Sequence, residues 1–390
     1  MGAVRRVVLG SAGALGAFAA GRLAARPRHP FPEVHGHELL GSARGRPHLI
    51  RGPRTSRIYT ERIGAEEIAS GVLVFTHGWC VTEAIWHHQK QALAGGRLVA
   101  VTWDLPGHGH STAVARSHLT LDLAVESLAR VVDDTPGDAV VLVGHSLGGV
   151  LTLGYLLQHP ETARRRIRGV VLVATPVMHT AARDRRWPGS AIPSRMLARG
   201  MQLAVENSVA DRWFAREAGT ADPRAASYRL IRAGFGDAPR PEHVRFVRDQ
   251  AASVPPSVRA DTFRAMTGFD LRSRLEDIGT PALVVYGGHD RLVQPADSRA
   301  LAGSLRRARV HEFPKAGHAL FLEHHEEFTA VVSRFAASRL VRTRNGGAAS
   351  PDVSPRPATN GTGAGRGNGT STSVPNPPAV PAAEPTVLLT

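Results

Sequence analysis

A single serine lies between two glycines in the stretch VLVGHSLGGV, residues 141–150, which is apolar on both sides of that turn. The Gly-x-Ser-x-Gly pattern consists of Gly144, His145, Ser146, Leu147 and Gly148. On a sharp turn from a buried strand to a helix, this pattern raises the serine hydroxyl above the sheet, where it can attack a carbonyl. The pattern also occurs by chance, with the serine as an ordinary polar residue at a helix start. Other residues must therefore decide between the two interpretations.

A carboxylate and an imidazole follow Ser146 in the chain, at positions where they could activate its hydroxyl. Asp290 ends the apolar stretch TPALVVYGGHD, and His318 lies in the loop after the next predicted strand. Both residues therefore belong to loops at the carboxyl ends of strands, and the chain order is serine, aspartate, histidine. Asp297 is the competing acid, but it lies inside the following predicted helix. The pattern favours Asp290.

Strands and helices that alternate along the chain must position these side chains. Runs rich in valine and leucine predict strands, and the stretches between them predict helices. The predicted strands, some with the loop that follows, are residues 71–79, 97–109, 139–144, 169–177, 280–290 and 309–314. The predicted helices are residues 82–93, 118–132, 147–158, 296–305 and 323–340. Strands buried on both faces that alternate with helices indicate an α/β fold with a mostly parallel sheet flanked by helices.

The alternation stops over residues 178–275, which are mostly helical in character and rich in arginine and alanine. We interpret this segment as a helical cap inserted between two core strands, above the carboxyl ends of the strands, where open α/β sheets bind ligands. The core then has two parts, residues 39–177 and 276–342. Candidates to line an acyl pocket are Met178, His179, Trp187, Met196 and Trp213. For each of them, packing between cap and core is the simpler explanation.

The two ends of the chain differ from this core in composition. Residues 1–26 contain the pair Arg5-Arg6 and a weakly apolar run rich in alanine and glycine, which predicts a signal peptide or a membrane anchor. An alanine-rich N-terminal helix is the alternative for this segment. Residues 343–390 consist mostly of small and polar residues with proline and predict a disordered tail. We therefore expect an exported or membrane-anchored protein, with a cytoplasmic one as the alternative.

The composition narrows the range of partners. The 390 residues carry a net charge of +15, but nearly all of the positive charge is arginine scattered along the chain, with lysine only at Lys90 and Lys315. The sequence has no basic stripe interleaved with aromatic residues, so nucleic-acid binding is not expected. A basic surface can still attract anionic lipid or acidic substrates. Cys80 is the only cysteine and no histidines have a metal-ligand spacing, so no metal site is expected.

Five motifs in order resemble those of the α/β-hydrolase superfamily, in particular its capped serine-hydrolase branch, which is esterase- and lipase-like. The motifs are His77-Gly78-Trp79-Cys80, residues 104–111 (DLPGHGHS), residues 144–149 (GHSLGG), Gly287-Gly288-His289-Asp290 and Gly317-His318. The resemblance covers the chain from about residue 45 to 340 and implies an α/β-hydrolase fold with a catalytic triad. In that triad Ser146 is the nucleophile, His318 the base and Asp290 the residue that orients the imidazole.

The resemblance implies acyl transfer through an acyl-enzyme on Ser146, which water then resolves without a cofactor. By position, the backbone N–H groups of Trp79 and Leu147 form the oxyanion hole, and one such donor is worth about 3 to 4 kcal/mol in the barrier. His77 and His145 are expected to brace their loops rather than to transfer protons.

Three further polar residues, Asp104, His108 and His110, are expected to structure the loop after their strand. Cys80 is expected to be a small buried residue rather than a second nucleophile.

The same motifs serve several activities, so they leave the substrate and the oligomeric state open. We expect a serine hydrolase that cleaves a small hydrophobic carboxylic ester. A thioesterase and a cofactor-free haloperoxidase- or perhydrolase-like enzyme are the alternatives. Epoxide hydrolases and haloalkane dehalogenases of this fold use an aspartate at position 146, so the serine argues against both. From another class, the fold also serves as a non-catalytic small-molecule-binding protein, but there the triad is often lost, whereas here all three positions are filled.

Overall fold

The computed structural model describes residues 39–64, 71–96, 98–115, 118–177, 228, 231–266 and 269–340. The predicted signal peptide or anchor, most of the predicted cap with its five candidate pocket residues, and the predicted tail lie outside the described residues. The predictions for these segments therefore stay predictions. None of the described helices is long and apolar enough to cross a membrane.

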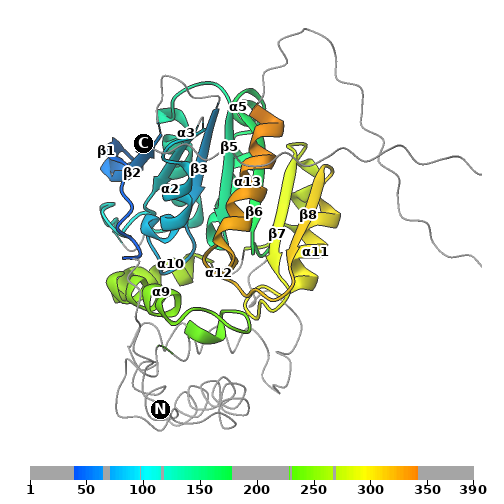
Figure 1. Ribbon diagram of the computed structural model, residues 1–390. Coiled ribbons are helices and arrows are strands. Elements are labelled where there is room, and N and C mark those ends of the chain that lie inside the picture. Colours follow the sequence, from blue (N-terminus) through cyan, green and yellow to red (C-terminus); the bar gives the residue numbers. More distant parts are fainter. Residues whose placement is uncertain are drawn as a thin grey trace, which may run out of the picture. The chain divides into compact units, whose positions relative to one another are not determined.

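One eight-stranded sheet forms the centre of the described residues (Figure 1). Its order is β1-β2-β4-β3-β5-β6-β7-β8. The pairs from β4 to β8 are parallel, whereas β2 pairs antiparallel with both β1 and β4. The strands are β1 (Arg46–Arg51), β2 (Arg57–Ile63), β3 (Gly71–Thr76), β4 (Leu98–Trp103), β5 (Val140–His145), β6 (Ile167–Val173), β7 (Ala282–Gly287) and β8 (Ala308–Phe313). The mostly parallel sheet confirms the fold class predicted from the alternating strands and helices.

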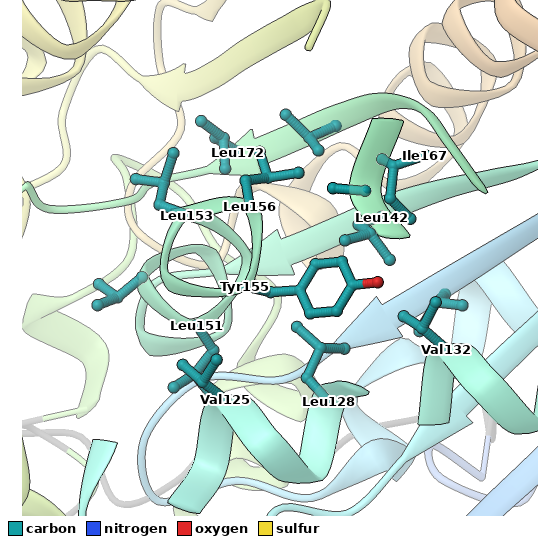
Figure 2. Close-up of a cluster of buried hydrophobic side chains, with 14 of the residues drawn as sticks. Val125, Leu128, Val132, Leu142, Leu151, Leu153, Tyr155, Leu156, Ile167 and Leu172 are labelled. Atoms are coloured by element: carbon teal, nitrogen blue, oxygen red, sulfur yellow. The ribbon is translucent and has the colours of Figure 1, made fainter. Parts of the chain in front are cut away.

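Helices cover both faces of this sheet (Figure 1). On one face lie α3 (Leu121–Asp134), α4 (Leu147–Gln158) and α11 (Pro295–Ser304), and on the other lie α2 (His87–Leu93) and α13 (His325–Leu340). Successive side chains of a strand point to opposite faces, so each central strand contributes to two apolar cores. In β5, for example, Leu142 lies in the first core and Val143 in the second. Figure 2 shows part of the first core, with Tyr155 of α4 at its centre.

The remaining described helices are short or lie near the carboxyl ends of the strands. They are η1 (Pro53–Thr55), η3 (Glu83–Trp86), α5 (Pro160–Arg166), α9 (Pro241–Ser253), α10 (Pro256–Met266), η6 (Arg272–Asp277) and α12 (Leu320–Glu323). In Figure 1, α9, α10 and α12 lie at the same end of the sheet. The predicted helix over residues 82–93 consists of η3 followed by α2. The predicted helix over residues 323–340 corresponds to α13, and the short helix α12 precedes it.

The sequence prediction was wrong over residues 46–63, where it contained no strand and the structure has β1 and β2. β1 lies at the edge of the sheet, and its Leu49 is 58% exposed, so this strand has no apolar run. β2 carries Glu61 buried inside the protein rather than an apolar side chain. Because edge strands and strands with buried charges lack a continuous apolar pattern, periodicity alone does not find them.

Candidate active site

The turn between β5 and α4 gives Ser146 a strained backbone. β5 ends at His145, α4 begins at Leu147, and Ser146 between them has φ of 52° and ψ of −113°. Positive φ is unfavourable for any residue with a side chain. Two glycines make the tight turn possible, because a Cβ on Gly144 would lie 2.4 Å from the carbonyl oxygen of Gly148, and one on Gly148 would lie 2.2 Å from that of Thr76.

We expect the variant Ser146→Gly to be more stable than Ser146→Ala. The positive φ of Ser146 costs a residue with a Cβ on the order of 1 to 3 kcal/mol, and alanine keeps that cost. Glycine removes it but loses about 0.5 to 1 kcal/mol more conformational entropy on folding. At the middle of both ranges the net gain over alanine is about 1 kcal/mol, measured by thermal unfolding of the two variants. Equal midpoints would show that the turn is not strained.

Asp290 and His318 form a hydrogen-bonded pair in the loops after β7 and β8. The distance from His318 Nδ1 to Asp290 Oδ2 is 2.8 Å. The other carboxylate oxygen, Oδ1, accepts hydrogen bonds from the backbone N–H groups of Leu292, at 2.8 Å, and Val293, at 3.0 Å. Both oxygens of the buried carboxylate are thus held in place, and a bond from Nδ1–H leaves Nε2 of His318 as a proton acceptor. Asp297, the competing acid, lies in the first turn of α11.

His145 links the turn of Ser146 to the loop of His318. Its Nε2 lies 3.1 Å from the backbone carbonyl oxygen of His318, and the centroids of the two rings are 4.7 Å apart. Ser146 is therefore one residue away from a side chain in contact with the candidate base. Among the described residues, no hydrogen bond joins the hydroxyl of Ser146 to the imidazole of His318. Such bonds are often long until substrate binds.

Solvent and substrate can reach two of these three side chains. Ser146 is partly exposed, and the side chain of His318 is 14% exposed while that of Asp290 is 0% exposed. A hydroxyl that attacks the carbonyl of a substrate has to be accessible from outside the protein, whereas a carboxylate that only orients the imidazole can be buried.

The loop after β3 lies directly against the serine turn. A Cβ on Gly148 would also lie 2.8 Å from the carbonyl oxygen of His77, and one on Gly78 would lie 2.8 Å from Nδ1 of His145. Within the described part of the chain, the backbone N–H groups of Trp79 and Leu147 donate to no other residue. Both N–H groups can therefore donate to an oxyanion, and that of Leu147 is at the positive end of α4.

His77 fastens this loop to the one that follows β4. Its Nδ1 lies 2.8 Å from the carbonyl oxygen of Gly78, and its Nε2 accepts a hydrogen bond from the N–H of Leu105 at 3.0 Å. Burial, with a smaller effect from the neighbouring His108, lowers the pKa of His77 to about 3. A neutral, hydrogen-bonded imidazole fits a brace for the loop rather than a group that transfers protons.

A network of buried charged side chains contacts the loop after β4, which begins at Asp104. The ammonium of Lys90 donates to Glu61 Oε2 at 2.7 Å and to Glu83, and Thr102 donates to Glu83 Oε2 at 3.0 Å. The backbone N–H of Glu83 donates to Asp104 Oδ1 at 2.9 Å, and burial raises the pKa of Asp104 to about 7. The sequence analysis missed this network, because charged residues such as Lys90 in a helix and Glu61 in a strand near the sheet edge ordinarily lie at the surface.

The buried His108 predicts a specific pH dependence of stability. Burial lowers its pKa from 6.5 to about 4. Between these values the unfolded chain binds a proton that the folded chain does not, so the contribution of His108 to stability is lost as the pH falls. We expect the stability difference between the wild type and His108→Gln to shrink by about 3 kcal/mol from about pH 7 to about pH 4.

Urea unfolding of the two proteins across this pH range measures the difference. The comparison between variants is necessary because Asp104, with its raised pKa, changes stability in the opposite direction. A difference that stays constant with pH would contradict a buried neutral imidazole at position 108.

Comparison with known proteins gives relatives over the same region. The sequence profile of the Alpha/beta hydrolase family matches residues 73–331. The pimeloyl-[acyl-carrier protein] methyl ester esterase of Vibrio campbellii is 30% identical over 270 residues, which is 68% of this chain and 94% of the relative. The enzyme of the same name from Aeromonas hydrophila is 29% identical over 264 residues, 67% of this chain and 94% of the relative.

Solved structures show the same fold. An esterase from Exiguobacterium antarcticum superposes with a TM-score of 0.60 at 20% identity, covering 74% of this chain and 98% of the other. A bromoperoxidase from Bacillus anthracis has a TM-score of 0.61 at 21% identity, covering 74% of this chain and 99% of the other. The fold and the superfamily expected from the five motifs are confirmed, and the protein is an ester hydrolase of the α/β fold. The chain belongs to the Alpha/beta hydrolase family.

Proposed function

We propose that this hydrolase cleaves carboxylic esters through a covalent acyl-enzyme on Ser146. One observation carries the proposal: the strained turn of Ser146 contacts, through His145, the loop of His318, whose Nδ1 is 2.8 Å from the buried Asp290. A nucleophile on a sharp turn, a base and a carboxylate that orients the base are the three groups that acyl transfer from an ester requires.

Each step of the reaction uses one of these groups. Nε2 of His318 takes the proton of Ser146 as Oγ attacks the ester carbonyl, and the N–H groups of Trp79 and Leu147 receive the resulting oxyanion. The imidazolium then gives its proton to the departing alcohol, which leaves the acyl group on Ser146. Water, activated by the same imidazole, hydrolyses this intermediate and frees the acid. The charge of Asp290 stabilises the imidazolium in both halves of the reaction.

The proposed substrate class is a carboxylic ester with a hydrophobic acyl chain. The methyl ester named for the Vibrio and Aeromonas relatives belongs to this class. An ester and a thioester both fit the steps above, and hydrolysis of p-nitrophenyl esters against hydrolysis of coenzyme A thioesters of the same acyl chains separates the two. We expect the esters to react faster, with a chain-length optimum that reports the size of the acyl pocket.

Covalent labelling tests the acyl-enzyme directly. A fluorophosphonate probe should modify the wild-type protein once, and fragmentation of the labelled peptide should place the adduct on Ser146. Rapid mixing with a p-nitrophenyl ester should release a burst of p-nitrophenolate equal to the enzyme concentration if deacylation is slower than acylation. A label on another residue, or the absence of both label and turnover in the folded protein, would refute the proposal.

A further inference from the structure

Arg259 of α10 lies beside the loop that carries the candidate oxyanion donor Trp79. The backbone carbonyl oxygen of Arg259 accepts a hydrogen bond from the indole Nε1–H of Trp79 at 3.0 Å. Phe263, one turn further along α10, packs on the same indole with 5.3 Å between ring centroids. These two contacts fasten α10 to the tryptophan. The helix therefore holds the backbone of Arg259 beside the side chain of Trp79, the residue whose backbone N–H is the candidate oxyanion donor.

The charge of Arg259 also affects the residue after Trp79. Burial raises the pKa of the Cys80 thiol, and the guanidinium of Arg259 lowers it by a smaller amount. Cys80 directly follows Trp79, so the cation is close enough to influence the loop itself and not only the helix that carries it.

Within the described residues, the side chain of Arg259 makes no hydrogen bond and no ion pair, although its Nε is buried. Its neighbours differ in this respect. Arg264 on the same helix is paired with Asp261 at 2.5 Å, and Arg248 on α9 is paired with Asp249 at 2.6 Å. A buried N–H without an acceptor costs stability, and since Arg259 is partly exposed, an external anion can reach its guanidinium. An anion bound beside Trp79 would supply the missing acceptor.

We propose that Arg259 binds a carboxylate on the ester that this enzyme hydrolyses. The inference rests on the proposed function, because it places the anion near an ester whose carbonyl oxygen lies at the N–H of Trp79. A guanidinium can hold both oxygens of a carboxylate or phosphate with two parallel hydrogen bonds. The net charge of +15 would also favour the approach of such a substrate. The anion belongs to either the acyl chain or the alcohol.

Two pairs of esters that differ only in charge test the proposal and distinguish these positions. On the acyl side, p-nitrophenyl hydrogen adipate is compared with p-nitrophenyl hexanoate, which has a methyl group in place of the carboxylate. On the alcohol side, the butanoate ester of γ-hydroxybutyrate is compared with butyl butanoate. For each pair, the ratio of kcat/KM for the anionic ester to that for the neutral ester is measured with the full-length protein.

The wild type should favour one of the anionic esters about tenfold or more over its neutral partner. Arg259→Met should lower that ratio about 10- to 100-fold, and Arg259→Lys, which keeps the charge but not the planar fork, should lower it less. Arg264→Met is the matched control, since this arginine lies on the same helix and is already paired with Asp261. It should leave the ratio unchanged.

Several results would overturn the proposal. Equal losses for the charged and the neutral ester in Arg259→Met would mean that the arginine only supports the loop. A wild-type enzyme that hydrolyses neutral esters without preferring an anionic partner in either pair would refute the anion site while the proposed function stands. No turnover of any ester and no fluorophosphonate label would refute the proposed function and this inference together.

Discussion

Ser146→Ala and His318→Ala should each lower kcat for ester hydrolysis by about 10⁵- to 10⁶-fold, and the double variant should be no worse than either single one. The first removes the attacking oxygen and the second removes the group that takes its proton. Because the two groups act in one step, losing either one removes the benefit of the other. Steady-state rates with p-nitrophenyl butanoate, at enzyme concentrations taken from the absorbance of the purified, folded variants, measure these losses.

Asp290→Asn should lower kcat by about 10⁴-fold. An amide has no charge to stabilise the imidazolium, and it favours the tautomer with the proton on Nε2, which cannot act as the base. Asp297→Asn is the matched control, because Asp297 lies in the first turn of α11 rather than at the end of β7. It should retain activity within about twofold, as expected for a substitution away from the reacting groups. Full activity in Ser146→Ala would refute the acyl-enzyme on Ser146. Full activity in Asp290→Asn would mean that another carboxylate orients His318.

The central strands and the positions of the candidate site residues on the loops after them could be predicted because they follow from local patterns. β5, with the sequence VVLVGH, is buried on both faces, which produces a continuous apolar run. In a parallel sheet, the loops after such strands gather at one edge, so Ser146, Asp290 and His318 could be placed together before any contact was known. The positive φ of Ser146 also has a sequence signal, since the glycines at positions 144 and 148 are needed for the close contacts of that turn.

Contacts between distant segments could not be predicted, because no local pattern marks them. Arg259 meets Trp79 across 180 residues of sequence, and nothing in the helix that carries this arginine sets it apart from the paired arginine at position 264. The buried charges are a second example. Lys90 lies in a predicted helix, where a lysine ordinarily indicates the solvent face, yet it is only 2% exposed. Its burial depends on Glu61, which lies in a strand that the apolar pattern did not reveal.

Lys90→Met should reduce the free energy of unfolding by about 3 to 5 kcal/mol at neutral pH. The side chains of Lys90, Glu61 and Glu83 are 1%, 1% and 2% exposed, and the ammonium contacts both carboxylates. Although burial raises the pKa of Glu61, the hydrogen bond from Lys90 and those from Gly45 and Tyr59 together hold it below its usual value. Removal of the ammonium leaves two buried carboxylates that repel each other, and this loss appears in urea unfolding at neutral pH.

Lys315, the only other lysine of the sequence, is exposed and provides the control for this loss. Lys315→Met should change the free energy of unfolding by less than about 0.5 kcal/mol. The triple variant Glu61→Gln, Glu83→Gln, Lys90→Met removes all three charges and should recover part of the stability lost in Lys90→Met, since no unpaired charge then stays buried. A loss in Lys90→Met as small as that in Lys315→Met would mean that the carboxylates take up protons instead. In that case Lys90→Met would gain stability relative to the wild type as the pH falls, because protonation of Glu61 in the folded variant breaks no ion pair.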